Sequence, residues 1–239
     1  PGNLRDGRYI PHRAMVPGKD PDPSAAAIST SQLKEVGSYK PRSASSVSSS
    51  GQKALRQWVA EYSGTGNGDD NAYAQAVDNA GNVYVTGTSF GGSSTGYDYA
   101  TIKYDASGNQ LWVARYTGPG NGLDAAGTIK VDNAGNVYVT GISAGSSTRD
   151  DYATIKYDAS GNQLWVARYT GPGFGAVALS IDNAGNVYVT GTSWVGNGSA
   201  DYATVKYDAS GNQLWAMRWD NQWHLQDYAR DLAVDNSGN

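Results

Sequence analysis

The sequence predicts an all-β fold, a β-propeller built from four-stranded antiparallel blades. A ten-residue phrase, Asp-Asn-Ala-Gly-Asn-Val-Tyr-Val-Thr-Gly, begins at Asp78, Asp132 and Asp182, and its first five positions return from Asp235 with Ser in place of Ala. The copies are 54, 50 and 53 residues apart, and a period near 50 residues is typical of propeller blades and solenoid coils. Tyrosine (17) and tryptophan (7) far outnumber phenylalanine (2), and glycine is frequent, as in turn-rich β-structure.

Each repeat contains four strand signals separated by turn residues. In the second repeat these signals are residues 127–131, 136–140, 152–157 and 163–169. Each alternates with a period of two residues, as a strand with two different faces requires. Residues 132–135 and 158–161 read as hairpin loops, in which Asp accepts bonds from turn amides and Gly takes a positive φ. Four antiparallel strands in chain order form a meander, the unit of a blade. The alternative, a parallel β-helix, lacks tight hairpins within each repeat.

Aromatic residues recur at fixed places in the repeat. Trp58, Trp112, Trp165 and Trp215 fall one to each outer strand, and Tyr84, Tyr138 and Tyr188 fall one to each second strand. Large rings at equivalent positions are suited to filling the wedge between neighbouring sheets.

The chain changes character near residue 56. Residues 1–56 are rich in proline and serine and have little apolar periodicity, so we expect an extended, non-globular arm or linker. Residues 57–239 carry the repeats: a lone outer strand at 58–62, about three complete blades ending with the outer strand 214–219, and one inner strand at 229–234. A propeller needs about four to eight blades. This incomplete array therefore predicts either that the polypeptide continues beyond Asn239 or that several copies complete a ring.

Composition excludes several classes of function. The formal net charge is −4 and the pI about 5.1, so no basic field attracts a phosphate backbone, and we expect no nucleic-acid partner. The chain has no cysteine, which removes disulfides, thiolate metal sites and cysteine nucleophiles. It also has no apolar run of about 18 residues, so we expect no membrane insertion.

Motifs with catalytic or metal-binding chemistry have simpler structural interpretations. Gly-x-Ser-x-Gly occurs at 87–91 and 141–145, but no helical pattern follows, and His12 and His224 are the only histidines available as a base. The Asp-x-x-Gly-Asn loops resemble structural turns more than calcium sites, which need six to eight oxygens. The pairs Asp69-Asp70 and Asp150-Asp151 read as solvated loop charge. We therefore expect no catalytic residue, metal site or cofactor.

A candidate contact surface lies where the repeat is least regular. Residues 218–224 replace the usual Arg-Tyr-Thr-Gly-Pro-Gly and contain Trp219, Trp223 and His224 beside Asp, Asn and Gln. Exposed tryptophan among such residues suits contact with sugar or protein. Alternatively, Trp219 replaces a core tyrosine and Trp223 caps the open edge. Trp194, in the segment 193–198, is a further candidate contact.

The repeat resembles a known family. The pattern Val-Asp-x-x-Gly-Asn-Val-Tyr-Val-Thr-Gly, followed by Asp-Tyr-Ala-Thr-Ile-Lys-Tyr-Asp-x-Ser-Gly-Asn-Gln-Leu-Trp, is similar to the bacterial SBBP repeats, named for a seven-bladed β-propeller. The resemblance covers residues 57 to 239. It implies a propeller in a secreted or cell-surface bacterial protein, without an assigned activity and without catalytic residues to transfer.

Together these observations predict a non-enzymatic, extracytoplasmic propeller, whether secreted, periplasmic or at the cell surface. We expect it to act as a structural scaffold or protein-interaction subunit of a larger complex or homo-oligomer, with the N-terminal arm docking on a partner. The alternative is a carbohydrate-binding propeller module with a glycan as ligand. A metal enzyme using the central funnel would need carboxylates near the axis, where the inner strands offer Lys130 and Ser180 instead.

Overall fold

The computed structural model describes residues 57–239, apart from 147–149, 171–174, 196–198, 221–225 and 236. The chain divides into two units, Pro1–Lys40 and Pro41–Asn239. The arm expected at residues 1–56 lies outside the described residues. The described part is all-β and contains no helix. Accordingly, it holds no helix with the length and apolar character needed to cross a membrane.

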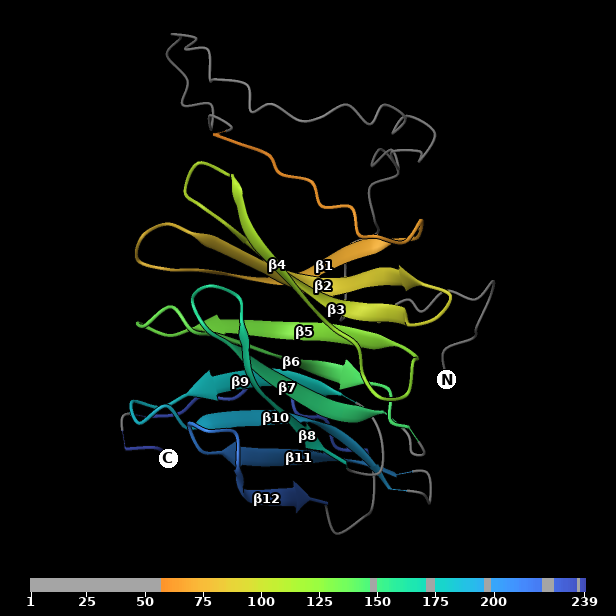
Figure 1. Ribbon diagram of the computed structural model, residues 1–239. Coiled ribbons are helices and arrows are strands. Elements are labelled where there is room, and N and C mark those ends of the chain that lie inside the picture. Colours follow the sequence, from red (N-terminus) through yellow and green to blue (C-terminus); the bar gives the residue numbers. More distant parts are fainter. Residues whose placement is uncertain (1–56, 147–149, 171–174, 196–198, 221–225, 236) are drawn as a thin grey trace, which may run out of the picture. The chain divides into compact units, whose positions relative to one another are not determined.

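Twelve strands form three four-stranded antiparallel sheets, each a meander in chain order (Figure 1). The first sheet contains β1 (Asp70–Val77), β2 (Val83–Gly92), β3 (Gly96–Tyr104) and β4 (Gln110–Tyr116). The second contains β5 (Asp124–Val131), β6 (Val137–Ser143), β7 (Asp151–Tyr157) and β8 (Gln163–Tyr169). The third contains β9 (Ala176–Ile181), β10 (Val187–Val195), β11 (Ser199–Tyr207) and β12 (Gln213–Trp219). The expected all-β class and the four-stranded antiparallel unit are confirmed, and the described sheets do not close into a ring.

The Asp-x-x-Gly-Asn loops close the hairpins as the sequence predicts. In the β5–β6 loop the amide of Gly135 donates to the carbonyl of Asp132 at 3.0 Å, and the amide of Asp132 donates to the carbonyl of Asn136 at 3.0 Å. Gly135 has φ +81° and Gly161, in the β7–β8 loop, has φ +85°. Only glycine takes this conformation at little cost, so the glycine of each loop is fixed by the turn.

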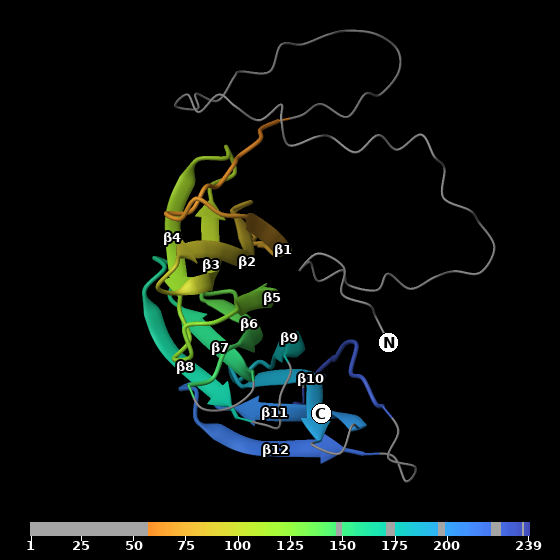
Figure 2. The ribbon, with the colours of Figure 1, turned by 90° about the vertical axis from the view of Figure 1, so that its right-hand side faces the viewer.

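Neighbouring sheets pack through equivalent apolar side chains. Tyrosines of one sheet lie against aliphatic side chains of the next. The contact of the first and second sheets includes Tyr84, Tyr99, Val137, Val139 and Ile155. The contact of the second and third includes Tyr138, Tyr152, Val187, Val189 and Val205. In Figure 2 the first strands β1, β5 and β9 follow one another on one side, and β4, β8 and β12 on the other.

Trp112 of β4 and Trp165 of β8 each cover a glycine turn of the following sheet. A Cβ placed on Gly161 would lie 2.8 Å from the Trp112 ring, and one on Gly211 would lie 2.7 Å from the Trp165 ring. The indole nitrogen of Trp112 also donates to the Ala159 carbonyl of the same turn at 3.1 Å. The aromatic rings thus do lie between sheets, as expected from their spacing.

Two expected strands are not strands in the structure. Residues 58–62 and 229–234 are extended but belong to no sheet, because each lacks a hydrogen-bonded neighbour among the described residues. The first still packs like an outer strand, since Ala60 and Tyr62 contact a cluster formed by Ala100, Ile102 and Tyr104. Periodicity predicts the local conformation, but a strand also requires a partner that periodicity alone does not supply.

We predict that Gly161→Ala is more destabilising than Gly185→Ala. Both glycines have left-handed φ, +85° and +81°, so both substitutions incur the backbone cost of about 1–2 kcal/mol. Only Gly161 lies under an indole ring, whereas a Cβ on Gly185 would meet the Ala209 methyl group at 3.4 Å. Overpacking should add about 1 kcal/mol or more to the loss for Gly161→Ala. Urea unfolding followed by circular dichroism measures both, and equal losses would contradict the role given to Trp112.

Candidate functional site

The turn carboxylates are already saturated with hydrogen bonds. Asp132 Oδ1 accepts from the amides of Ala134 and Asn136, each at 2.9 Å, and its Oδ2 accepts from Asn136 Nδ2 at 2.8 Å and the Tyr138 hydroxyl at 3.1 Å. Burial raises the pKa of Asp132, but these hydrogen bonds outweigh burial and hold the pKa below its ordinary value. The carboxylate therefore belongs to the turn, as the sequence predicts.

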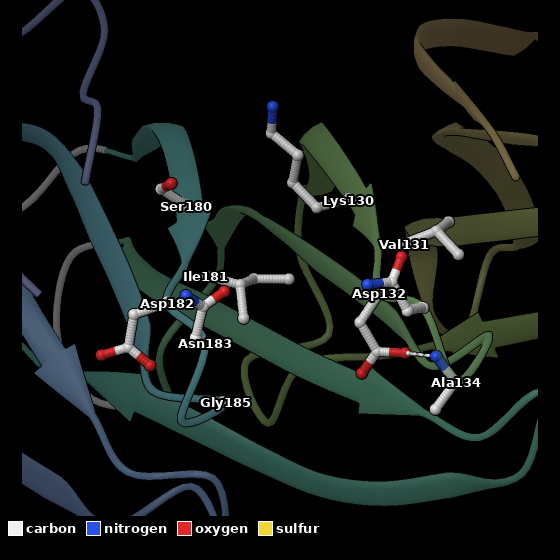
Figure 3. Close-up of a pocket in the computed structure, with 10 residues that line it drawn as sticks. Lys130, Val131, Asp132, Ala134, Ser180, Ile181, Asp182, Asn183 and Gly185 are labelled. Carbon is white, nitrogen blue, oxygen red and sulfur yellow. Dashed lines mark hydrogen bonds between the residues drawn. The ribbon is translucent and has the colours of Figure 1, made fainter. Parts of the chain in front are cut away.

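A polar cleft of about 510 Å³ opens between these turns in the second and third sheets (Figure 3). Lys130 of β5 and Ser180 of β9 line it together with Asp132 and Asp182. Asp182 accepts from the four equivalent donors of its own repeat, at 2.7 to 3.2 Å. Figure 3 shows the Lys130 side chain extending away from both carboxylates. The cleft thus brings no acid and base together for proton transfer.

Arg168 is the centre of a partly buried polar cluster on the second sheet. Its Nη1 donates to Ser143 Oγ at 2.7 Å and to the Tyr116 hydroxyl at 2.6 Å. Its Nη2 forms an ion pair with Asp151 at 2.7 Å. Tyr116 comes from β4 of the first sheet, so the guanidinium ties two sheets together. We call Arg168, Ser143, Asp151 and Tyr116 the arginine cluster.

The first sheet repeats this cluster with equivalent residues. Arg115 donates to Ser89 Oγ at 2.6 Å, to Asp98 at 2.8 Å and to the Tyr62 hydroxyl at 3.3 Å. Ser89 and Ser143 are the serines of the two Gly-x-Ser-x-Gly motifs. Both are fully buried and held by arginine, so neither is placed as a nucleophile.

The third sheet keeps only part of the cluster. Arg218 pairs with Asp201 at 2.6 Å, but the buried Ser193 hydroxyl has no hydrogen-bond partner among the described residues. The sequence offers a reason. Asp124 precedes the turn residue Asp132 by eight positions and hydrogen-bonds with Ser143, whereas Phe174 precedes Asp182 by the same interval.

The paired aspartates are therefore not all solvated loop charges, and that expectation is wrong for two of them. Asp151 is buried and ion-paired with Arg168. Asp70 accepts from the amide of Gly64 at 2.8 Å, which fixes the segment before β1. The partner of Asp151 lies 17 residues away across the β7–β8 hairpin. The adjacency of the two carboxylates in the sequence therefore could not indicate this ion pair.

Exposed leucines occupy one equivalent position on each outer strand. Leu111, Leu164 and Leu214 are 52%, 53% and 53% exposed on β4, β8 and β12. These strands are also edges of their sheets, with one unpaired side of backbone. Each leucine is the middle residue of a Gln-Leu-Trp triplet that the sequence repeats, but the triplet alone does not predict that the leucine is exposed. The result is a repeated apolar position beside a free strand edge, which we call the leucine row.

Only one predicted contact residue can be placed with its side chain. Trp219 ends β12, is half exposed, and stacks on Tyr202 with ring centroids 5.6 Å apart at 20°. Trp194 lies in β10, but its side chain is outside the described part, as are Trp223 and His224 entirely. The structure therefore does not unite these four residues in one described site.

Among the described residues, one group of acids is close enough to hold a cation. Ligand oxygens of Asp201, Asp220 and Asp227 lie within 4.8 Å of one another. Asp220 stands where the other repeats have Thr117 and Thr170, a departure visible in the sequence. Arg218 already neutralises Asp201, and each of the three acids has an interaction within the protein. The group therefore resembles a polar cluster held by interactions within the protein, with Asp201 buried and Asp220 exposed.

Comparison with known proteins adds little. No protein-family model and no curated protein matches the chain. A solved structure described as a eukaryotic initiation factor is similar with a TM-score of 0.42 and 6% identity, covering 64% of this chain and 33% of that chain. A protein of unknown function from Bacteroides caccae has a TM-score of 0.42 and 12% identity, covering 70% and 50%. The chain spans a third to a half of these proteins, and likeness at this level carries no argument.

We predict opposite pH responses for two aspartate variants. Burial raises the pKa of Asp124, despite its bonds to Ser143 and to the amides of Gly118 and Ala144. Bonds from Asn162 lower the pKa of the exposed Asp158. A raised folded-state pKa contributes stability below the ordinary value of about 4 and loses it as pH rises; a lowered one loses stability as pH falls below about 4.

The expected result follows from these signs. As pH falls from 7 to 4, the wild type should gain unfolding free energy relative to Asp124→Asn. Between pH 4 and pH 3 it should lose unfolding free energy relative to Asp158→Asn. Denaturant unfolding at pH 7, 5.5, 4 and 3 provides the comparison. The same sign for both variants would show that Asp124 does not carry a buried charge at neutral pH.

Proposed function

We propose that the three sheets are successive blades of a β-propeller of the SBBP-like type, serving as a non-enzymatic, extracytoplasmic scaffold or protein-interaction subunit. Two features support the architecture. Each sheet is a four-stranded meander, and neighbouring sheets contact one another through equivalent residues. Their first strands also follow one another on one side (Figure 2), as the inner strands of a propeller do.

The leucine row is the observation that carries the interaction role. Leu111, Leu164 and Leu214 present equal exposed apolar area at equal places on three neighbouring sheets. Each lies on an edge strand whose free backbone groups can pair with an extended segment of another protein. Repetition of the same weak site lets one partner bind at several points with higher overall affinity. A protein partner extending along the row therefore fits this surface.

The polar groups of the repeat support the absence of an enzymatic role. Ser89 and Ser143 are held by arginine, and the turn aspartates are saturated by their own loops. A general base must reach the proton that it removes, and the aspartates that line the cleft already accept hydrogen bonds from their own loops. The geometry therefore favours a structural role for each of these groups.

The N-terminal arm forms part of the proposal. Its composition in residues 1–56, poor in apolar residues and rich in proline and serine, suits an extended tether that reaches a partner. In this proposal the arm adds contact length to the leucine row and strengthens binding without a folded domain of its own.

We predict that a photo-crosslinking amino acid in place of Leu111, Leu164 or Leu214 captures a protein partner in cells that produce the chain. The same adduct should form from more than one of the three positions, because the positions are equivalent. Asn133, exposed in the β5–β6 turn, provides the matched control. Deletion of residues 1–56 should reduce the yield. Adducts that form equally well at Asn133, or at no leucine position, would contradict the proposal.

Carbohydrate binding is the second candidate, favoured by Trp219. Its half-exposed ring lies flat on Tyr202, and an exposed planar aromatic surface suits the apolar face of a sugar. The wild type should then bind members of a glycan array, and Trp219→Ala should abolish that binding. Met217→Ala, two residues away on β12, should retain it. An array without signal for the wild type would remove this candidate.

A further inference from the structure

The segment before β1 (orange in Figure 1) packs against the first sheet as β4 packs against the second. Three contacts match those made by β4 on the second sheet. Trp58 covers Gly108 as Trp112 covers Gly161, with Cβ-to-ring distances of 2.7 and 2.8 Å. Tyr62 accepts from Arg115 as Tyr116 accepts from Arg168.

The third match fixes the end of this segment. Gly64 donates its amide to Asp70 at 2.8 Å, and Gly118, which follows β4, donates to Asp124 at 2.7 Å. Residues 58–62 therefore lie as the fourth strand of a sheet whose other strands are not among the described residues. Unlike β4, they have no hydrogen-bonded neighbour strand there. We call residues 58–62 the entry strand.

An apolar groove of about 410 Å³ remains beside the entry strand. Its lining includes Trp58, Val83, Val85, Ile102 and Tyr104. In the second sheet the equivalents of the last four are Val137, Val139, Ile155 and Tyr157, and these are fully buried. They are covered in part by Tyr84 and Tyr99 of the first sheet. The groove is thus the receiving half of a contact that the chain makes twice elsewhere.

We propose that this groove binds a β-hairpin of the chain's own repeat type, consisting of a second and a third strand with tyrosines equivalent to Tyr84 and Tyr99. This inference rests on the proposed reading of the sheets as successive blades and names the class of segment that the first sheet receives. The hairpin's third strand pairs with the free edge of the entry strand. Its two tyrosines enter the groove and cover Val85 and Ile102.

Existing contacts specify how the hairpin lies. Tyr99 donates its hydroxyl to the Ala153 carbonyl at 3.3 Å, so the equivalent tyrosine reaches the carbonyl of Ala100. Tyr84 meets Trp112 edge to face, with centroids 6.1 Å apart, so its equivalent meets Trp58. Thr101 is opposite Ala114 in the β3–β4 ladder, so its equivalent is opposite Ala60.

The test uses the full chain and a probe with the sequence of Val83–Tyr104 fused to a soluble carrier. Calorimetric titration should show saturable binding. Tyr84→Ser and Tyr99→Ser in the probe should each weaken binding by about tenfold or more, because buried aromatic anchors dominate such contacts. Tyr104→Ser is the matched control, since this tyrosine belongs to the opposite face and should change affinity little.

A disulfide trap locates the bound probe. The chain has no cysteine of its own. Ala60→Cys in the chain should cross-link with Thr101→Cys in the probe, because directly opposed residues have Cβ atoms about 5 Å apart. It should not cross-link with Ile102→Cys, which points to the other face of the strand. A longer probe, Asp70–Tyr104, adds the first strand and guards against a hairpin too short to fold alone.

Each outcome decides the proposal. Saturable binding with the tyrosine preference and the Thr101 cross-link supports it. No binding by either probe, equal loss with Tyr104→Ser, or indiscriminate cross-linking overturns it. Adducts at the leucine row in cells, together with failure of both probes, would leave the interaction role intact and reject this groove as the receiving site. Probe binding without leucine adducts would do the reverse.

Discussion

The contact on which the fold depends is the one between an outer-strand tryptophan and a glycine turn of the next sheet. Trp112 lies where a side chain on Gly161 would have to be, and its indole nitrogen donates to the carbonyl of Ala159 in that turn. Lys103 donates to the same carbonyl and lies over the Tyr84 ring. This turn therefore needs glycine for its φ angle, lies beneath the indole ring and accepts hydrogen bonds from two donors. Neither the turn nor the tryptophan can change alone. Repetition of this contact explains why the repeats are so similar.

Buried charged groups specify how the packed sheets align. A buried ion pair is weak support for stability, because desolvation of both charges offsets their attraction. The arginine cluster instead specifies alignment, since Arg168 reaches a hydroxyl of the preceding sheet as well as the carboxylate of its own hairpin partner. Its planar fork of N–H donors suits several acceptors held in fixed directions. Where the repeat shortens before β9, the cluster loses a member and Ser193 is left without a partner among the described residues.

Sequence reasoning predicted what local chemistry determines. The strand expected at 163–169 is β8, and the loop aspartates and glycines have the bonds and φ values that turn chemistry requires. It failed where a partner decides the outcome. Asp151 is buried because Arg168 comes back across a hairpin, and residues 229–234 are not a strand because no neighbour among the described residues pairs with them. The exposure of Leu111 and its equivalents depends on what the next sheet covers, which alternation within one strand cannot show.

Similarity between repeats also limits where function can lie. The tyrosines, tryptophans and arginines that recur in the repeat are used for contacts between sheets. What remains available is the outer edge, which the contacts leave uncovered, and positions that depart from the repeat. On β12, Met217 and Trp219 stand where β8 has Ala167 and Tyr169, and both are exposed. A larger apolar side chain in place of alanine cannot be explained by the packing that the other sheets share. The third sheet therefore presents apolar side chains at two positions where the second sheet differs, whereas the first sheet retains the common receiving face.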